Sequence, residues 1–146
     1  MRVRRVVTGH SPEGKAIVAS DELVEPIEFG TGGAYHAPWG ADAPARFPDD
    51  GSAPAWSMPF PPPGGHRFLL MTLPVGSARD AGTDAELSSF LADSLGEIME
   101  KDEPGMHKTA TIDYEVVLAG RIGLELDDGR EILLAPGDVV VQNGTR

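Results

Sequence analysis

Two residues in the last third of the chain have the chemistry and the spacing of metal ligands. His107 and Asp113 lie six positions apart at the entry to an expected strand, and an even separation within a regular strand places two side chains on one face. Imidazole nitrogen and carboxylate oxygen suit divalent transition metals such as Fe, Zn, Mn, Co and Ni. Thr109, between them, is a poor ligand, but its hydroxyl could hold a substrate oxygen. An isolated His–Asp pair is more often solvent-facing, so the pattern alone leaves both interpretations open.

The elements that must position this pair are short strands in quick succession. Residues 112–118 and 122–127 alternate apolar and polar side chains, which is the period of half-buried antiparallel strands. Asp128-Gly129 predicts a two-residue hairpin turn, because glycine accepts the positive φ that such turns need. Residues 132–134 are the expected returning strand. Residues 139–141 are all valine, and we expect them to be buried on both faces of a sheet.

The spacing of these residues resembles the first motif of the cupin family, in its small single-domain conserved-barrel type. That motif has the form His-x-His, a few residues, Glu, six residues, Gly. His107 matches its first position and Gly120 its last. Thr109 stands at the position of the second His, and Asp113 at that of the Glu. The two replacements leave the identity of the metal open.

The last residues resemble the second cupin motif. The segment 136–146, PGDVVVQNGTR, is similar to most of that motif, which normally ends in a His that completes the metal site. The chain stops at Arg146, where this His is expected. The resemblance therefore predicts that the natural barrel continues, and that a sheet edge or a metal site built from these residues alone is incomplete.

The resemblance implies an all-β fold, an antiparallel jelly-roll or cupin barrel that forms homodimers. It implies that His107 and Asp113 are metal ligands and that the cofactor is a divalent transition metal. A third ligand, the expected His, would leave coordination positions open for substrate or water. Thr109 and Gln142 are the residues of this region that we expect to contact a substrate. Tyr114 neighbours Asp113, so it should point to the opposite face and pack there.

The function implied is that of a metal-dependent enzyme acting on a small organic substrate. The family hosts dioxygenases, decarboxylases, dehydratases and isomerases, and the fold does not choose among them. An aromatic or polyketide-like substrate is preferred because the N-terminal half contains a loop rich in aromatic residues. The alternative is a non-catalytic ligand-binding or structural cupin, which Thr109 in place of a His favours. Metal content of the purified protein separates the two.

Length and composition set the remaining bounds. The 146 residues have the size of one domain, and we expect a single cupin-like domain. Residues 1–75 would supply strands and a loop that pack on the barrel, and residues 105–146 its core. The net charge of −11 argues against nucleic-acid and anionic-membrane partners. The chain has no cysteine and no apolar run near the roughly 20 residues of a membrane span, so we expect a cytoplasmic protein.

The N-terminal segment predicts three strands, at about 2–8, 15–20 and 23–29, with a break at Ser20-Asp21-Glu22. The arginines of the first strand could form an anion site. Protection of a sheet edge by charged side chains is the commoner role.

Residues 30–65 are irregular and rich in glycine, proline and aromatic side chains. Disordered linkers rarely concentrate aromatics, so we expect an ordered loop with a short strand near residues 34–39, followed by a strand at 66–73. His36 and Trp39 could line a substrate pocket. The alternative is that Trp39 and Trp56 cover apolar surface and that His36 is a hydrogen-bonded surface histidine.

One amphipathic helix is expected at about residues 84–100. Its apolar side chains recur with the helical period of 3.6 residues. Thr83 and Glu86 form a capping box before it, and Pro104-Gly105 ends it. The stripe predicted to be buried consists of Leu87, Phe90, Leu91, Leu95 and Ile98.

Overall fold

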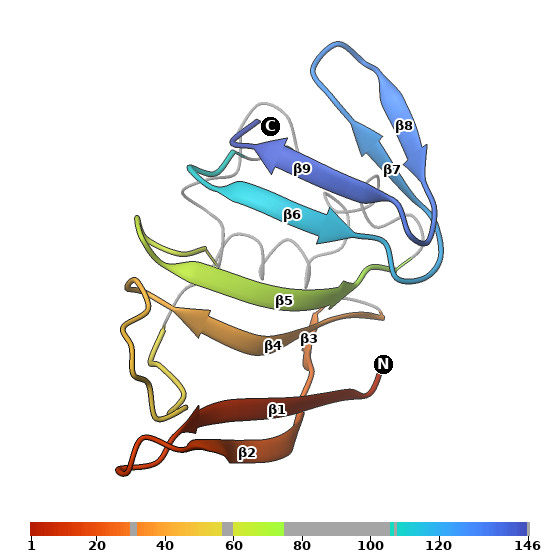
Figure 1. The fold of residues 1–146 in the computed structure, drawn as a ribbon. Coiled ribbons are helices and arrows are strands. Elements are labelled where there is room, and N and C mark those ends of the chain that lie inside the picture. Colours follow the sequence, from red (N-terminus) through yellow and green to blue (C-terminus); the bar gives the residue numbers. More distant parts are fainter. Residues whose placement is uncertain (30–31, 57–59, 75–105, 107, 146) are drawn as a thin grey trace. The chain divides into compact units, whose positions relative to one another are not determined.

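The computed structural model describes residues 1–29, 32–56, 60–74, 106 and 108–145. The described residues form nine strands, every pairing between strands is antiparallel, and none of these residues is helical. The all-β prediction is therefore confirmed for this part of the chain (Figure 1). The chain divides into two compact units, Met1–Gly96 and Glu97–Arg146, which are described one after the other.

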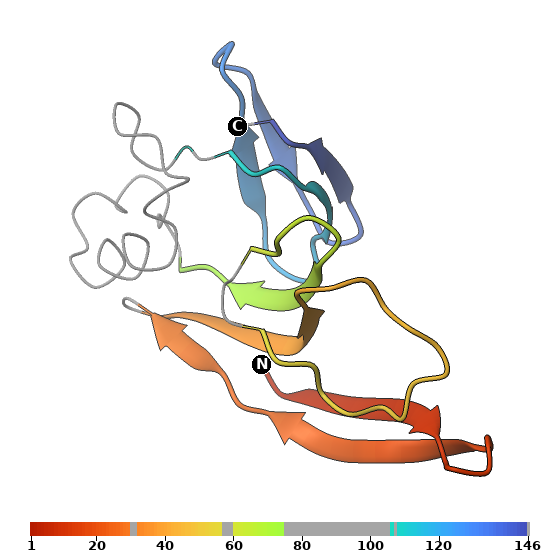
Figure 2. The same cartoon turned by 90° about the vertical axis from the view of Figure 1, so that its left-hand side faces the viewer.

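The first unit contains a hairpin and a three-stranded sheet (Figures 1 and 2). The hairpin pairs β1 with β2, and the sheet has the order β3-β4-β5. The bounds of these strands are β1 Val3–His10, β2 Ala16–Val24, β3 Ile27–Phe29, β4 Gly33–Ala41 and β5 His66–Thr72.

The second unit contains two separate strand pairs, β6 with β9 and β7 with β8. Neither pair joins into a closed barrel with the strands described here. The bounds are β6 Ile112–Val116, β7 Ile122–Glu125, β8 Glu131–Leu134 and β9 Val139–Asn143.

The β1–β2 hairpin corrects the predicted break at residues 20–22. β2 runs through Asp21 and Glu22 without interruption, because both carboxylates pair with arginines of β1. Arg4 donates to both oxygens of Asp21, at 2.6 and 2.5 Å, and Arg5 forms an ion pair with Glu22. The arginines of β1 are thus cross-strand partners of Asp21 and Glu22, the acidic residues at which a break between strands was predicted.

The Arg4–Asp21 pair makes a small part of the stability dependent on pH. The hydrogen bonds from Arg4 lower the pKa of the Asp21 carboxyl from its ordinary value of 3.8. The unfolded chain therefore binds this proton more readily, so the stabilisation is present above about pH 4 and is lost as the pH falls through the folded-state pKa.

We expect Asp21→Asn to lower the melting temperature slightly at pH 7 and to have a smaller effect near pH 2. The pair is exposed, so the difference is small. Thermal unfolding of both proteins across this pH range, followed by tryptophan fluorescence, measures it. A difference of the same size at both pH values would show that the ion pair is not its cause.

Arg5 connects the hairpin to the three-stranded sheet. Its guanidinium donates to the carbonyl oxygen of Pro38 at 3.0 Å and lies over the ring of Trp39, 5.6 Å from the ring centre. Both contacted residues belong to β4. A cation over an indole face is attracted by the ring's quadrupole, so Trp39 packs against charge as well as covering apolar surface.

The irregular segment between β4 and β5 is held by specific contacts. Arg67 stacks over Trp56, with 4.5 Å from its guanidinium carbon to the ring centre, and forms an ion pair with Asp42. The backbone of Asp49 accepts a hydrogen bond from the His10 amide at 2.8 Å. The prediction of an ordered loop is confirmed for the described residues of this segment.

In the second unit the predicted hairpin is confirmed, but the two-residue turn is not: the Leu126 amide donates to the Arg130 carbonyl oxygen, which leaves the three residues 127–129 in the turn. β7 and β8 pair from Ile122↔Leu134 to Glu125↔Glu131, and Gly129 in the turn has a φ of +72°. A side chain with a Cβ is rarely found in this left-handed region. The Asp128 carboxylate accepts a hydrogen bond from the Arg130 amide at 3.0 Å, which holds the turn.

The prediction that residues 139–141 are buried on both faces is wrong for the structure described. Val139 and Val141 are 64% and 51% exposed, and Val140 is half-buried. The reason is that β9 pairs with β6 alone, and no other described strand of this unit covers the face that carries Val139 and Val141. A run of valines predicts a strand, but burial depends on what packs against it.

The expected helix at residues 84–100 lies outside the described residues. Within the described part of the chain, no helix is long and apolar enough to cross a membrane.

Candidate small-molecule site on strands β6 and β9

The candidate site is a row of polar side chains at alternate positions leading into β6. Thr109, Thr111 and Asp113 are two residues apart, so the extended backbone turns Thr111 and Asp113 to the same side. Gln142 of β9 is the direct register partner of Asp113, and directly opposed residues of an antiparallel pair share a face. All four are half-buried. Residues 109 to 113 and β9 therefore bring three of the predicted site residues together.

Hydrogen bonds connect the first three of these side chains. The hydroxyl oxygens of Thr109 and Thr111 are 2.6 Å apart, so one donates to the other. Thr109 Oγ1 also lies 3.5 Å from Asp113 Oδ2, a long contact. Among the described side chains, Thr109 alone hydrogen-bonds the Asp113 carboxylate. Most of the carboxylate's acceptor capacity is thus left for another donor or for a cation.

Gln142 is held from its other side by the segment that follows β9. Its amide nitrogen donates to the carbonyl oxygen of Thr145 at 3.0 Å, which leaves the side-chain oxygen as an acceptor. Gly144 has a φ of +62°, and a Cβ there would lie 3.2 Å from the carbonyl oxygen of Thr109. The chain after β9 therefore approaches the backbone of Thr109 closely, and glycine permits this approach.

Thr111 is a member of the site that the sequence analysis missed. It has the same period of two as Thr109 and Asp113, and this spacing could have identified it.

The opposite face of the β6–β9 pair is apolar and exposed. Tyr114 is 78% exposed, so the expectation that it packs is wrong for the described structure. Its position on the face opposite Asp113 follows from the alternation along β6. The other exposed apolar residues of these two strands are Ile112, Val116, Val139 and Val141.

The side chains of this cluster can be compared with the ligands that the predicted metal would need. His107 lies outside the described residues, so its distance from Asp113 is not part of the structure. Within the described residues, no three His, Cys, Asp or Glu side chains come together as a metal site would require. The described cluster supplies one carboxylate and neutral hydroxyl and amide oxygens. Such oxygens suit a divalent cation, but a stable site needs further ligands.

The other two predicted site residues, His36 and Trp39, have different neighbours in the structure. Both lie on β4 with an irregularity in the β4–β5 pairing between them. Trp39 contacts Arg5, whereas His36 is only 2% exposed and lines a pocket beside β1 and β2. The alternative of a hydrogen-bonded surface histidine is therefore wrong, because the side chain is buried and neither ring nitrogen has a hydrogen-bond partner among the described residues.

Comparison with known proteins gives short matches. No protein-family model matches the chain. A 40-residue segment is 58% identical to phomopsin biosynthesis cluster protein C' of Diaporthe leptostromiformis, covering 27% of this chain and 21% of that protein. Phomopsin biosynthesis cluster protein D of the same organism matches with the same identity and coverage. Oryzines biosynthesis cluster protein J of Aspergillus oryzae (strain ATCC 42149 / RIB 40) is 46% identical over 43 residues, 30% of this chain and 24% of that protein. The matches thus span less than a quarter of each relative.

Proposed function

We propose that this chain is part of a cupin-type protein that binds a divalent transition metal and acts on a small organic molecule in a biosynthetic route. The observation that carries the proposal is the Thr109–Thr111–Asp113 cluster with Gln142 opposite it in register. Polar side chains converge on one half-buried face there, which is how small-molecule sites orient their ligands. The proposal includes a jelly-roll barrel with a helix at residues 84–100, and a homodimer, as the resemblance implies.

The relatives support the biosynthetic part. All three are named as proteins of biosynthesis clusters, and the identity of the matched segments is high for so short a length. An aromatic or polyketide-like molecule is the proposed substrate class, and dioxygenase, decarboxylase, dehydratase and isomerase chemistry remain the proposed alternatives for the reaction.

In this proposal Asp113 and His107 hold the metal, which would be Fe, Zn, Mn, Co or Ni. The available acceptor capacity of the Asp113 carboxylate supports its part in this role. A bound metal of this kind polarises a substrate oxygen as a Lewis acid. Thr109 orients the Asp113 carboxylate through its hydroxyl, and Thr111 fixes the Thr109 hydroxyl in turn. Gln142 offers its side-chain oxygen to a substrate donor, since its amide nitrogen is engaged by Thr145.

The test is metal binding by the full chain and by Asp113→Asn. We expect the natural chain to bind Co²⁺ with visible absorption bands that indicate protein ligands. We expect the substitution to weaken binding by about 10–100-fold or more, since changes even to groups around a metal site cost that much. Titration calorimetry with Co²⁺ and with Zn²⁺ measures both affinities.

Glu125→Gln is the matched control, because it makes the same change from carboxylate to amide at an exposed position of β7 in the same unit. It should bind Co²⁺ as the natural chain does. Equal loss of affinity in both variants would indicate nonspecific attraction to a chain of net charge −11. Unchanged affinity in Asp113→Asn would remove Asp113 from the site.

The second candidate is a non-catalytic ligand-binding or structural cupin. It is favoured by the lack, among the described side chains, of a cluster of three metal-binding residues. In that case Co²⁺ and Zn²⁺ would not bind specifically to the natural chain, and the Thr109–Asp113–Gln142 face would contact the ligand through hydrogen bonds alone.

A further inference from the structure

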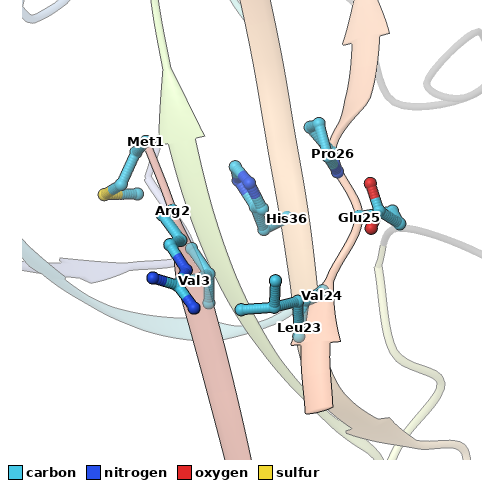
Figure 3. A pocket seen from close by; sticks show the side chains of 8 residues that line it. All are labelled: Met1, Arg2, Val3, Leu23, Val24, Glu25, Pro26 and His36. Carbon is cyan, nitrogen blue, oxygen red and sulfur yellow. The ribbon is translucent and has the colours of Figure 1, made fainter.

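The first unit contains a pocket of about 230 Å³ where the start of β1, the end of β2 and β4 meet. Figure 3 shows His36 projecting from β4 into the space between Met1 and Pro26. Most of its lining is apolar and includes Val3, Leu23 and Val24. Met1 and Pro26 are exposed, so the pocket opens to solvent at these residues.

His36 is the one fully buried polar side chain that lines this pocket in the described structure. It is 2% exposed, and neither Nδ1 nor Nε2 has a hydrogen-bond partner. A neutral imidazole has one N–H donor and one lone-pair acceptor. Leaving such a group buried without partners is unfavourable, because it gives up its hydrogen bonds to water and gains none in return. Because this unsatisfied imidazole lies beside a pocket, a ligand group could supply the missing hydrogen-bond partner.

We propose that this pocket binds a small neutral ring compound that carries one hydroxyl group, of the size and chemistry of a phenol. The hydroxyl would pair with an imidazole nitrogen of His36, and the ring would contact the apolar side chains around it. The inference concerns the first unit alone and does not depend on the metal site proposed for the second.

The volume and the charges of the pocket select this ligand class. An apolar cavity of about 150 Å³ accepts benzene, so 230 Å³ accommodates a ring with a substituent. The two charged residues in the lining, Arg2 and Glu25, have opposite signs and are exposed. The two side-chain charges offset each other, and both side chains are in contact with solvent, so they do not select an ionised ligand over a neutral one.

The ring nitrogens of His36 are covered in the structure described, so binding requires a small side-chain movement. Rotamer changes at binding surfaces are common and do not need backbone movement. Met1 and Arg2 lie at the opening and are exposed, so their side chains can move without losing a packed environment.

The experiment is a titration of the full chain with phenol and, separately, with toluene, which has the same ring and no hydroxyl. Nuclear magnetic resonance follows the ring signals of His36 and the amide signals of Val3 and Val24, which line the pocket. We expect saturable shifts with phenol and affinity about 3–10-fold higher than for toluene, the effect of one net hydrogen bond.

Two variants make the same substitution at different histidines. His36→Phe removes both ring nitrogens and should abolish the preference for phenol over toluene. His66→Phe, at an exposed position at the start of β5, should keep that preference. If His36→Phe does not fold, His36→Gln, which keeps a donor and an acceptor, replaces it and should retain part of the preference.

Three results would overturn the inference. The first is a set of shifts that do not saturate, the second is equal affinity for phenol and toluene in the natural chain, and the third is an unchanged preference in His36→Phe.

Discussion

Replacing Arg67 with methionine is expected to destabilise the first unit by about 2–4 kcal/mol, somewhat less than the roughly 3–5 kcal/mol for breaking a fully buried ion pair. Its side chain is only 5% exposed. The substitution keeps most of the apolar stem but removes the guanidinium, which leaves the Asp42 carboxylate without its partner. It also leaves the carbonyl oxygens of Ala41 and His66 without the donors that now lie at 2.8 and 2.9 Å.

The expected cost is lower than for a fully buried pair because the Asp42 side chain is partly accessible to water. Asp42 is 39% exposed, so water can solvate its carboxylate once the arginine is gone. The loss of the stack on Trp56 adds about 0.5–1 kcal/mol, as for cation–π pairs near a surface. Because Arg67 attaches the loop to β4 and β5, the segment around Trp56 should become more mobile than the strands.

Both tryptophans of the chain lie in the first unit, so unfolding in urea followed by tryptophan fluorescence reports on that unit. Arg46→Met is the matched control, since it makes the same substitution at an exposed position of the same loop. It should change the free energy of unfolding by less than about 0.5 kcal/mol. A loss in Arg67→Met no larger than in this control would show that the loop is held by other contacts.

The sequence predicts those features of the fold that depend on neighbouring residues. Alternation of apolar and polar side chains correctly predicted β6 and β7, and Asp128-Gly129 correctly placed the turn between β7 and β8. The break predicted within β2 was wrong because Asp21 and Glu22 pair with arginines of β1 that lie 17 residues earlier in the sequence. Local propensity does not include such pairs.

The candidate site also combines features that neighbouring residues predict with features that depend on residues far apart in the sequence. The alternation of Thr109 and Asp113 is local, and the structure confirms that these residues lie together. Gln142 joins them through a register between strands that are far apart in the sequence, which no local pattern predicts. The burial of His36 depends on the ends of β1 and β2 meeting over β4. No pattern in the residues around His36 predicts this burial. The sequence therefore suggested a pocket at His36 but not which residues line it.

Replacing Gly9 with alanine is expected to be the most damaging single methyl addition in the first unit. A Cβ at Gly9 would lie 2.0 Å from the carbonyl oxygen of Asp50, 2.2 Å from its carbonyl carbon and 2.7 Å from the Gly51 nitrogen. All three atoms belong to the backbone, so no side-chain rotation relieves the overlap. The loop must move away from β1, which breaks the hydrogen bond from the His10 amide to Asp49.

Overpacking of this kind costs about 1–3 kcal/mol, and more where the backbone must shift. We therefore expect Gly9→Ala to lose at least about 3 kcal/mol of unfolding free energy, measured by urea unfolding with tryptophan fluorescence. The loop at residues 48–52 would separate from the hairpin, and amide hydrogen exchange of His10, Gly51 and Ser52 should accelerate before the strands unfold.

Gly123→Ala is the contrasting substitution, because the Cβ would meet a flexible group. Its nearest atom is Oε1 of Glu131 at 2.7 Å, which lies at the end of an exposed side chain that can rotate. Alanine also lowers the conformational entropy of the unfolded chain. This effect stabilises the folded protein by about 0.4–1 kcal/mol where alanine can adopt the native backbone conformation. Because Gly123 lies in the second unit and both tryptophans lie in the first, urea unfolding of this variant is followed by circular dichroism, and it should lose far less unfolding free energy than Gly9→Ala. If Gly9→Ala were as well tolerated as Gly123→Ala, the loop at Asp50 would not rest on β1 as the structure shows.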